Sequence, residues 1–74
     1  MLAVDLIQTG QNIMKLSKEC GMTVRDLQDI FGFGSANTIY KWQAGENLPK
    51  VDNLVVLAGL FGVTMDEIVA VKNI

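Results

Sequence analysis

The side chains of this sequence that could do chemistry are hydrogen-bonding groups and not reactive ones. Its 74 residues include no His and only one Cys, which excludes zinc sites built from Cys and His, nucleophiles paired with His, and internal disulfides. Because no acids, bases or nucleophiles cluster either, we expect that the protein is not an enzyme and binds no metal. Cys20 is most simply a small buried residue in a reducing cytosol.

Hydrogen-bonding side chains are concentrated in GFGSANTIYKWQAGENLP, residues 32–49, which also holds the only Trp, Tyr and Pro of the chain. Ser35 is well placed to cap a helix that runs from Ala36 to about Ala44. The helical repeat sorts the side chains into an inward and an outward face: Ile39, Trp42 and Gln43, and Asn37, Lys41 and Ala44. We predict that Trp42 packs in the core, while the short outward face is polar and cationic.

Five helical patterns, separated by turns that contain Gly, predict an all-α fold. The helices are expected at about residues 9–20, 23–31, 35–44, 52–61 and 64–70. Their expected capping residues are Thr9, Thr23, Ser35, Asp52 and Thr64. Two of these caps are paired with an acid three residues later, Thr23 with Asp26 and Thr64 with Glu67, as in a capping box.

The fourth predicted helix and both ends of the chain have more apolar residues than one core stripe needs. Val56 and Leu60 lie off the stripe of the fourth helix, which predicts a dimer contact or cover by a terminal segment. Apolar residues also recur at the two ends: Leu2, Val4 and Leu6, and Val69, Val71 and Ile74. These ends are either ragged tails or short strands that pair, within one chain or between two.

Length and charge limit the classes of protein to consider. A chain of 74 residues buries only roughly 60% of its unfolded surface, so residues 1–74 are expected to form a single domain. The net charge of -2 argues against a general binder of polyanions, although five of the six basic residues lie between positions 15 and 50. The longest apolar stretch, residues 54–63, is about half the ~20 residues of a membrane helix, so we expect a soluble, cytoplasmic protein.

The second and third predicted helices, joined by a tight turn, have the layout of a helix-turn-helix unit. Together with their neighbourhood, the segments MTVRDLQDIFGF, SANTIYKWQAGENLP, VDNLVVLAGLFGV and TMDEI resemble the Cro and phage-repressor (XRE-type) helix-turn-helix family over roughly residues 9–69. This resemblance implies a five-helix DNA-binding domain, usually dimeric, which acts as a transcriptional repressor or regulator without a cofactor. Its partners would be double-stranded DNA and a second copy of the chain.

The resemblance also implies which residues contact DNA. The major-groove face would be formed by Ser35, Ala36, Asn37, Tyr40 and Lys41. Residues by the phosphates would be Thr23, Val24 and Arg25 at the start of the second helix, and Asn47 to Lys50 in the loop. The chemistry agrees, because Asn can pair with adenine, Lys can donate to guanine, and helix N-termini suit phosphate.

Several of these assignments have alternatives. Tyr40 is either a contact to DNA or a half-buried side chain with its hydroxyl in water, and Lys41 is either a DNA contact or a solvated lysine. Arg25 can reach a phosphate or pair with Asp29 one helical turn later. An alternative function is also open, in which the domain is a protein-interaction module, such as an antitoxin-like partner, with weak or no DNA binding.

The sequence departs from the family pattern at four places. Val24 replaces a Gln that grips phosphate in many relatives, Gln28 replaces a small Ala, and the turn before Ser35 holds one extra residue. The family often buries an Arg of the first helix against a Glu, and the corresponding residues here are Ser17 and Gln43. Since one buried charge without its partner costs on the order of 3 to 5 kcal/mol, their joint absence predicts a neutral contact between Ser17 and Gln43.

Overall fold

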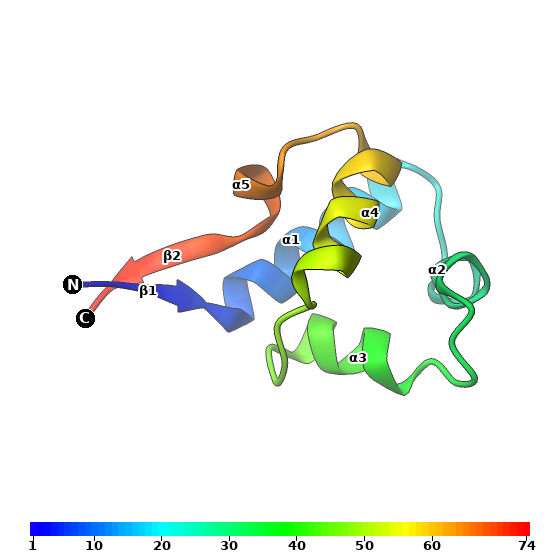
Figure 1. Ribbon diagram of the computed structural model, residues 1–74, viewed down its shortest axis with the longest axis horizontal. Coiled ribbons are helices and arrows are strands. Elements are labelled where there is room, and N and C mark those ends of the chain that lie inside the picture. The colour runs from blue at the N-terminus through cyan, green and yellow to red at the C-terminus, as the bar shows by residue number, and fades with distance from the viewer.

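The computed structural model describes all 74 residues and confirms the predicted five-helix architecture, with a small sheet added at the ends (Figure 1). The elements follow in the order β1 (Leu2–Asp5), α1 (Leu6–Glu19), α2 (Val24–Phe31), α3 (Asn37–Ala44), α4 (Val51–Phe61), α5 (Met65–Ile68) and β2 (Ala70–Asn73). The helices surround one core, to which all five contribute: Ile13, Leu27, Ile39, Trp42, Leu54, Leu57, Phe61 and Ile68.

The two ends of the chain form an antiparallel pair of strands, which we call the β-ribbon. Its register runs from Leu2 opposite Asn73 to Asp5 opposite Ala70. The β-ribbon projects from the helices along the long axis of the molecule, which measures 37 Å, and both termini lie at its tip (Figure 1). Of the two interpretations of the apolar ends, the structure therefore shows paired strands within one chain.

The predicted start of the first helix at Thr9 is wrong, because β1 leads directly into α1. The extended backbone of Asp5 supplies the cap, and its carboxylate accepts a hydrogen bond from the Gln8 N–H (3.0 Å). Thr9 lies inside the helix and is buried, and its hydroxyl oxygen accepts from the Ala70 N–H (2.9 Å). Thr9 thus holds the base of β2 against α1.

Two of the other four predicted caps are confirmed. Thr23 and Thr64 each form a full capping box. Ser35 and Asp52 do not occupy the capping position, which falls to Ala36 and Lys50, neither of which provides a side-chain hydrogen bond. Ser35 is one residue further out, where its hydroxyl accepts from the Asn37 N–H (3.3 Å), and Asp52 lies within the first turn of α4.

Three further expectations about single elements need correction. The last helix ends at Ile68 and not near residue 70, because Val69 turns into the extended conformation that leads to β2. Leu60 packs against the core of its own chain, whereas Val56 is 42% exposed and its expected dimer contact stays a prediction. Cys20 is exposed and not buried, since it is the C-terminal cap of α1, where its thiol lies 4.0 Å from the Phe61 carbonyl oxygen.

Helices α1 and α3 approach each other backbone to backbone, and two glycines permit this. A Cβ atom on buried Gly10 would lie 2.8 Å from the carbonyl oxygen of Gln43 and would overlap that of Trp42. Gly45, which ends α3 with a φ of 75°, would place a Cβ 2.8 Å from the Cα of Ile7. The position of α3 therefore depends on the absence of side chains at both glycines.

The predicted neutral contact between Ser17 and Gln43, direct or through water, is not formed as a direct hydrogen bond. Ser17 is buried as expected, but its hydroxyl donates to the Ile13 carbonyl oxygen one turn earlier in α1 (2.6 Å). This local bond satisfies the only side-chain donor of Ser17, so α1 needs no polar partner on α3. The two helices are joined by close backbone packing where other family members are expected to use an ion pair.

We predict that Gly10→Ala lowers the free energy of unfolding by about 1–3 kcal/mol or more, because the new methyl group meets backbone atoms that cannot rotate away. Chemical denaturation followed by circular dichroism measures this. Gly59→Ala is the matched control, since Gly59 is also helical but has no atom within 4 Å of the added Cβ. The free energy of unfolding of this control should rise by about 0.5–1 kcal/mol, because Ala favours the helix over Gly. Equal stability of both variants would contradict the close packing of α1 and α3.

Candidate nucleic-acid interface

Three aromatic rings fix the angle between α2 and α3. Phe31, at the end of α2, stacks on Phe33 in the turn, with ring centroids 5.2 Å apart and planes 11° apart. Trp42 of α3 meets both rings edge-on, at 5.6 and 5.9 Å. Trp42 is only 2% exposed, so the prediction that it belongs to the core is confirmed.

The extra residue in the turn is integrated in this packing. Gly32 ends α2 in the left-handed conformation, and the chain then turns Phe33 back under the two helices. The Gln28 side chain donates from Nε2 to the carbonyl oxygen of Phe33 (3.2 Å). The longer turn thus provides the hydrogen-bond acceptor that the half-buried Gln28 side chain requires. Relatives are expected to have a small residue in place of Gln28.

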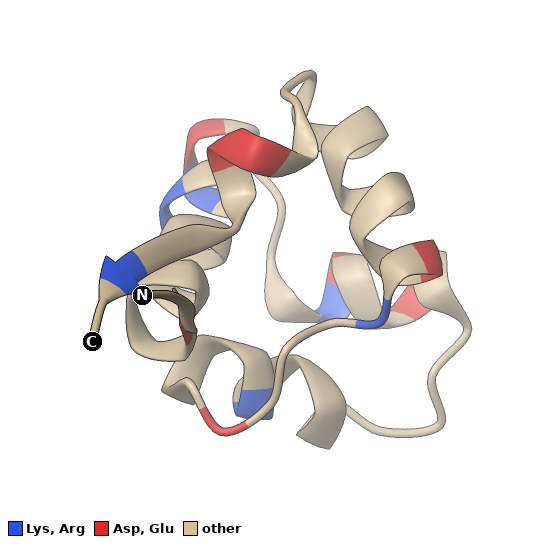
Figure 2. Cartoon of the chain, turned by 60° about the vertical axis from the view of Figure 1, so that its left-hand side comes forward, with Lys and Arg blue, Asp and Glu red and all other residues tan.

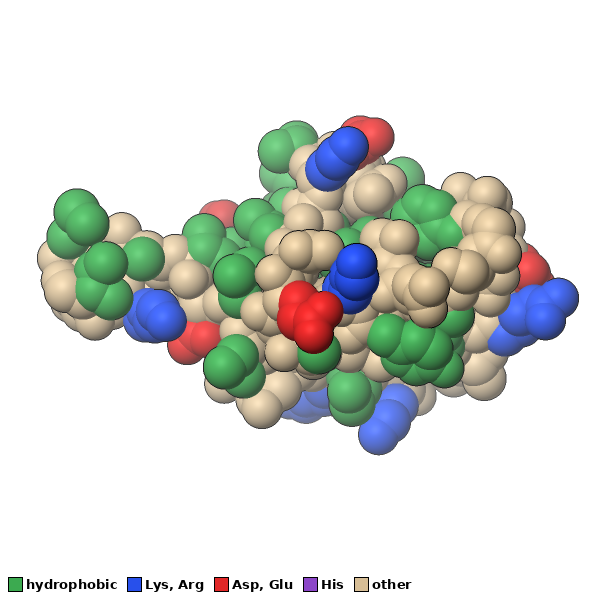
Figure 3. Space-filling view, turned by 90° about the horizontal axis from the view of Figure 1, so that it is seen from below, with side chains coloured by type: hydrophobic (Ala, Val, Ile, Leu, Met, Phe, Trp, Pro, Cys, Tyr) green, Lys and Arg blue, Asp and Glu red, His purple; other side chains and the backbone are tan.

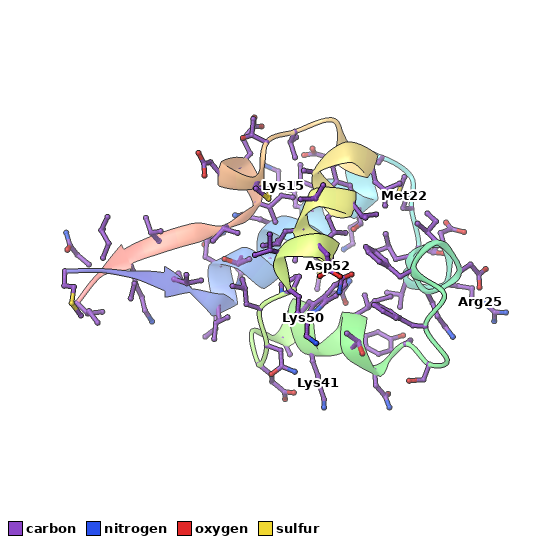
Figure 4. The ribbon with its side chains drawn as sticks, viewed as in Figure 1. Lys15, Met22, Arg25, Lys41, Lys50 and Asp52 are labelled. Carbon is purple, nitrogen blue, oxygen red and sulfur yellow. The ribbon has the colours of Figure 1, made fainter.

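The outward face of α3 is exposed, and its side chains form no ion pair within the protein. Asn37, Tyr40 and Lys41 are exposed, whereas Ile39 and Trp42 on the opposite side are buried. Tyr40 is 55% exposed, which agrees with either of its two interpretations. Lys41 points away from the body of the molecule (Figure 4). At the start of the helix Ser35 is exposed and Ala36 is half-buried.

A groove of about 600 Å³ lies beside the first turns of α3 and α4. It is lined by Phe33, Thr38, Asn47, Leu48, Lys50, Asp52 and Asn53. The structure thus brings Asn47 and Lys50, both predicted, together with Thr38 and Asn53, which were missed. Thr38 had a signal, because it precedes Lys41 by three residues on the same side of the helix, and Asn53 is a polar residue in an apolar helix.

Two of the three residues predicted at the start of α2, its cap Thr23 and Arg25, are already engaged within the protein. The Thr23 hydroxyl accepts from the Asp26 N–H (3.1 Å), and the Asp26 carboxylate accepts from the Thr23 N–H (2.9 Å). Arg25 pairs with Asp29 at 3.2 Å, on the exposed side of α2 (Figure 4). Arg25 therefore forms the local ion pair that was one of its alternatives, and contact with a phosphate requires that this pair open or be shared.

Charges around the groove nearly balance. Lys50 and Asp52 line the groove, and Lys41 and Glu46 lie at the end of α3 and in the loop that follows it. No ion pair joins them, because the ion pairs of the structure are those of Lys15 with Glu19 and Arg25 with Asp29. Basic positions are spread over several segments (Figure 2), and the face of α3 shows an acidic beside a basic side chain near its centre (Figure 3). A continuous basic patch is absent from this face.

No three Cys, Asp or Glu side chains are grouped so that they could hold a metal ion. None of the helices has both the length and the apolar composition that crossing a membrane requires.

Comparisons with known proteins agree with this geometry. The model of the helix-turn-helix family matches residues 12–68, which cover α1 from Asn12 onward and the whole of α2 to α5. The crystal structure of the DNA-binding domain of BldD superposes with a TM-score of 0.73 over 89% of this chain and 94% of that chain. The two sequences are 19% identical, so the likeness is one of fold. No match was found among curated proteins.

The capping box of α2 makes a prediction about pH. The pKa of Asp26 lies below its ordinary value of 3.8, chiefly because the Thr23 N–H donates to the carboxylate, with a further contribution from the Thr23 side chain. A lowered pKa stabilises the fold above the unfolded-state pKa, and this stabilisation is lost as the pH falls through the folded-state value.

Asp26→Asn should therefore lower the melting temperature near about pH 7, and the deficit should shrink as the pH approaches about 2. Thermal unfolding of both proteins across this range measures the difference. Asp66→Asn is the control, because the Asp66 side chain accepts no hydrogen bond from a capping residue. A deficit that stays constant down to the lowest pH would refute the assigned cause.

Proposed function

The chain belongs to the helix-turn-helix family, and from this membership we propose that it is a sequence-specific DNA-binding regulator that inserts α3 into the major groove. The observation that carries the proposal is the outward face of α3. Asn37, Tyr40 and Lys41 are exposed there, on a helix that Gly10 and Trp42 hold rigidly from behind. A helix supported in this way can present its side chains to base edges without losing much conformational freedom.

The residue types on α3 match what base edges offer. Asn37 can accept from and donate to adenine at N6 and N7, and Lys41 can donate to O6 and N7 of guanine. Asn37, Tyr40 and Lys41 are three and four residues apart, so they project from adjacent turns on one side of the helix. They would reach neighbouring base pairs, with Ser35 and Ala36 at the end of α3 nearest the duplex.

Phosphate contacts would come from the groove beside α3. Thr38, Asn47, Lys50 and Asn53 bring hydroxyl, amide and ammonium donors to its walls. The first turn of α4 has no side-chain cap, so its amide groups remain available to an anion. Thr23 and Arg25 would make flanking contacts from α2. These contacts position the domain, whereas those of α3 select the sequence.

We further propose that the regulator acts as a dimer and represses. Glu46 and Asp52 offset Lys41 and Lys50 near the proposed contact surface, so one copy should bind DNA weakly. Two copies joined by a two-fold axis would engage two half-sites about 34 Å apart, and the second contact, being intramolecular, would raise the overall affinity. Repression would require only that the bound dimer overlap the site at which RNA polymerase binds.

Selection from a pool of random duplexes tests sequence-specific binding, followed by fluorescence anisotropy on the enriched sequence. Asn37→Ala should weaken the free energy of binding by about 1–3 kcal/mol, or roughly 5- to 150-fold in affinity. It should also relax specificity at one base pair. Lys18→Ala is the control, because Lys18 is exposed on α1 and has no ion pair. If no sequence is enriched, or both variants bind equally, the proposal fails.

Lys50→Ala separates the phosphate contacts from the base contacts. It should weaken binding to all duplexes alike and lower the slope of the logarithm of affinity against that of salt concentration by about 1. Asn37→Ala should leave this slope unchanged, because it removes no charge. A sequence-dependent loss in Lys50→Ala would instead place Lys50 at a base edge.

A protein-interaction module, such as an antitoxin-like partner, is the alternative function, and exposed residues of α4 favour it. Val51, Val55 and Val56 are 70%, 56% and 42% exposed on a helix of high mean hydropathy. Co-purification of a different protein that Val55→Lys abolishes, together with failure of the duplex selection, would choose this function over DNA binding.

A further inference from the structure

The β-ribbon has two unpaired edges, and they differ in how well they are protected. Met1 and Ile74 exchange backbone hydrogen bonds (2.8 and 3.2 Å), so the residues at alternate positions turn their N–H and C=O groups outward. On β1 these are Leu2 and Val4, and on β2 they are Val71 and Asn73. Proteins commonly protect such edges with Lys, Pro or a bulge. The sequence of β2, AVKN, contains a Lys, whereas that of β1, LAVD, has none of these.

The β-ribbon is nevertheless firmly placed. Asp5 caps α1, the Thr9 hydroxyl accepts from the Ala70 N–H, and the Asn12 side chain donates to the Ile68 carbonyl oxygen (3.0 Å). A pair of strands without a third strand or a packed face is only marginally stable in water. On one face of this pair, Leu2, Val4 and Val71 are 67%, 39% and 59% exposed. The base of the β-ribbon is thus fixed while its outer edge and one face lack a partner.

We propose that β1 is the dimer interface, pairing antiparallel with β1 of a second copy of this chain to form a four-stranded sheet. The inference rests on the proposed function, for which it supplies the missing contact. The free N–H and C=O groups of a strand edge pair with another extended segment. When two identical strands pair antiparallel, a two-fold axis relates them, so the assembly stops at a dimer. Leu2 and Val4 of both copies would lie side by side on one face of the new sheet.

A second copy of the chain closes the free edge of β1 without a third molecule. The two-fold axis of an antiparallel pair of identical strands is perpendicular to the plane of the sheet, so each copy covers the β1 edge of the other.

The spacing agrees with this arrangement. Four residues of strand span about 13 Å. Two molecules 37 Å long that overlap by this length have their midpoints about 24 Å apart. Each α3 lies beyond the midpoint on the side away from the β-ribbon (Figure 1), so the two recognition helices are further apart than the midpoints. The distance between the two α3 helices is thus larger than about 24 Å and closer to the ~34 Å of one turn of DNA.

Proline substitution tests the edge directly. Val4 and Val71 face each other in the β-ribbon, and both turn their N–H groups outward. Val4→Pro removes a donor from the free edge of β1, and Val71→Pro removes the equivalent donor from the free edge of β2, while neither removes a bond between the two strands. Sedimentation without DNA should show a dimer for the natural chain and Val71→Pro. The dissociation constant of Val4→Pro should rise at least about tenfold, with an unchanged circular dichroism spectrum.

Amide hydrogen exchange provides a second measurement that needs no substitution. The Leu2 and Val4 amides should become protected as the protein concentration rises, whereas those of Val71 and Asn73 should not. A dimer in which Val71→Pro and not Val4→Pro is defective would place the interface on β2 and overturn the proposal. So would a dimer that neither variant weakens, or a protein that remains monomeric at all concentrations.

The two proposals can fail separately. A β1-paired dimer for which duplex selection enriches no sequence would refute DNA binding and leave the interface intact. Selective binding of a duplex by a protein that does not pair through β1 would do the reverse.

Discussion

The arrangement depends on the contact between the backbones of α1 and α3 at Gly10. No side chain separates the two helices there, so α3 lies directly on α1 and cannot shift without opening the core. Such contacts are short-range and steep, and they define position more narrowly than a flexible ion pair does. The loss of the charged pair expected in relatives therefore does not loosen α3, because Ser17 is satisfied within its own helix.

Rigidity on one side of α3 and freedom on the other follow from the same residues. Phe31, Phe33 and Trp42 occupy the space between α2 and α3, which leaves the opposite face to solvent. That face offers hydrogen-bond donors but little net charge, since Lys41 is its one basic residue and Glu46 follows in the next loop. Under the proposed function, binding would gain less from general attraction to a polyanion and more from correct base contacts, which favours selectivity over affinity.

Much of the fold was predictable because helical periodicity and capping residues are local signals. The core role of Trp42, the two capping boxes and the outward face of α3 followed from spacing alone. The errors arose where distant segments decide: Asp5 replaced Thr9 as a cap because β1 continues into α1, and Thr9 was needed by β2. The groove was only partly predicted, since Thr38 and Asn53 meet across a loop whose path is set by the packing of α3 and α4.

The β-ribbon joins residues from opposite ends of the chain, with Leu2 opposite Asn73. Closing a loop of nearly the whole chain carries a large entropic penalty, which local helix formation does not. The helices must therefore bring the ends close before the strands can pair. Folding of this protein would then finish at its termini, and the ribbon would be the last part to gain order and the first to lose it.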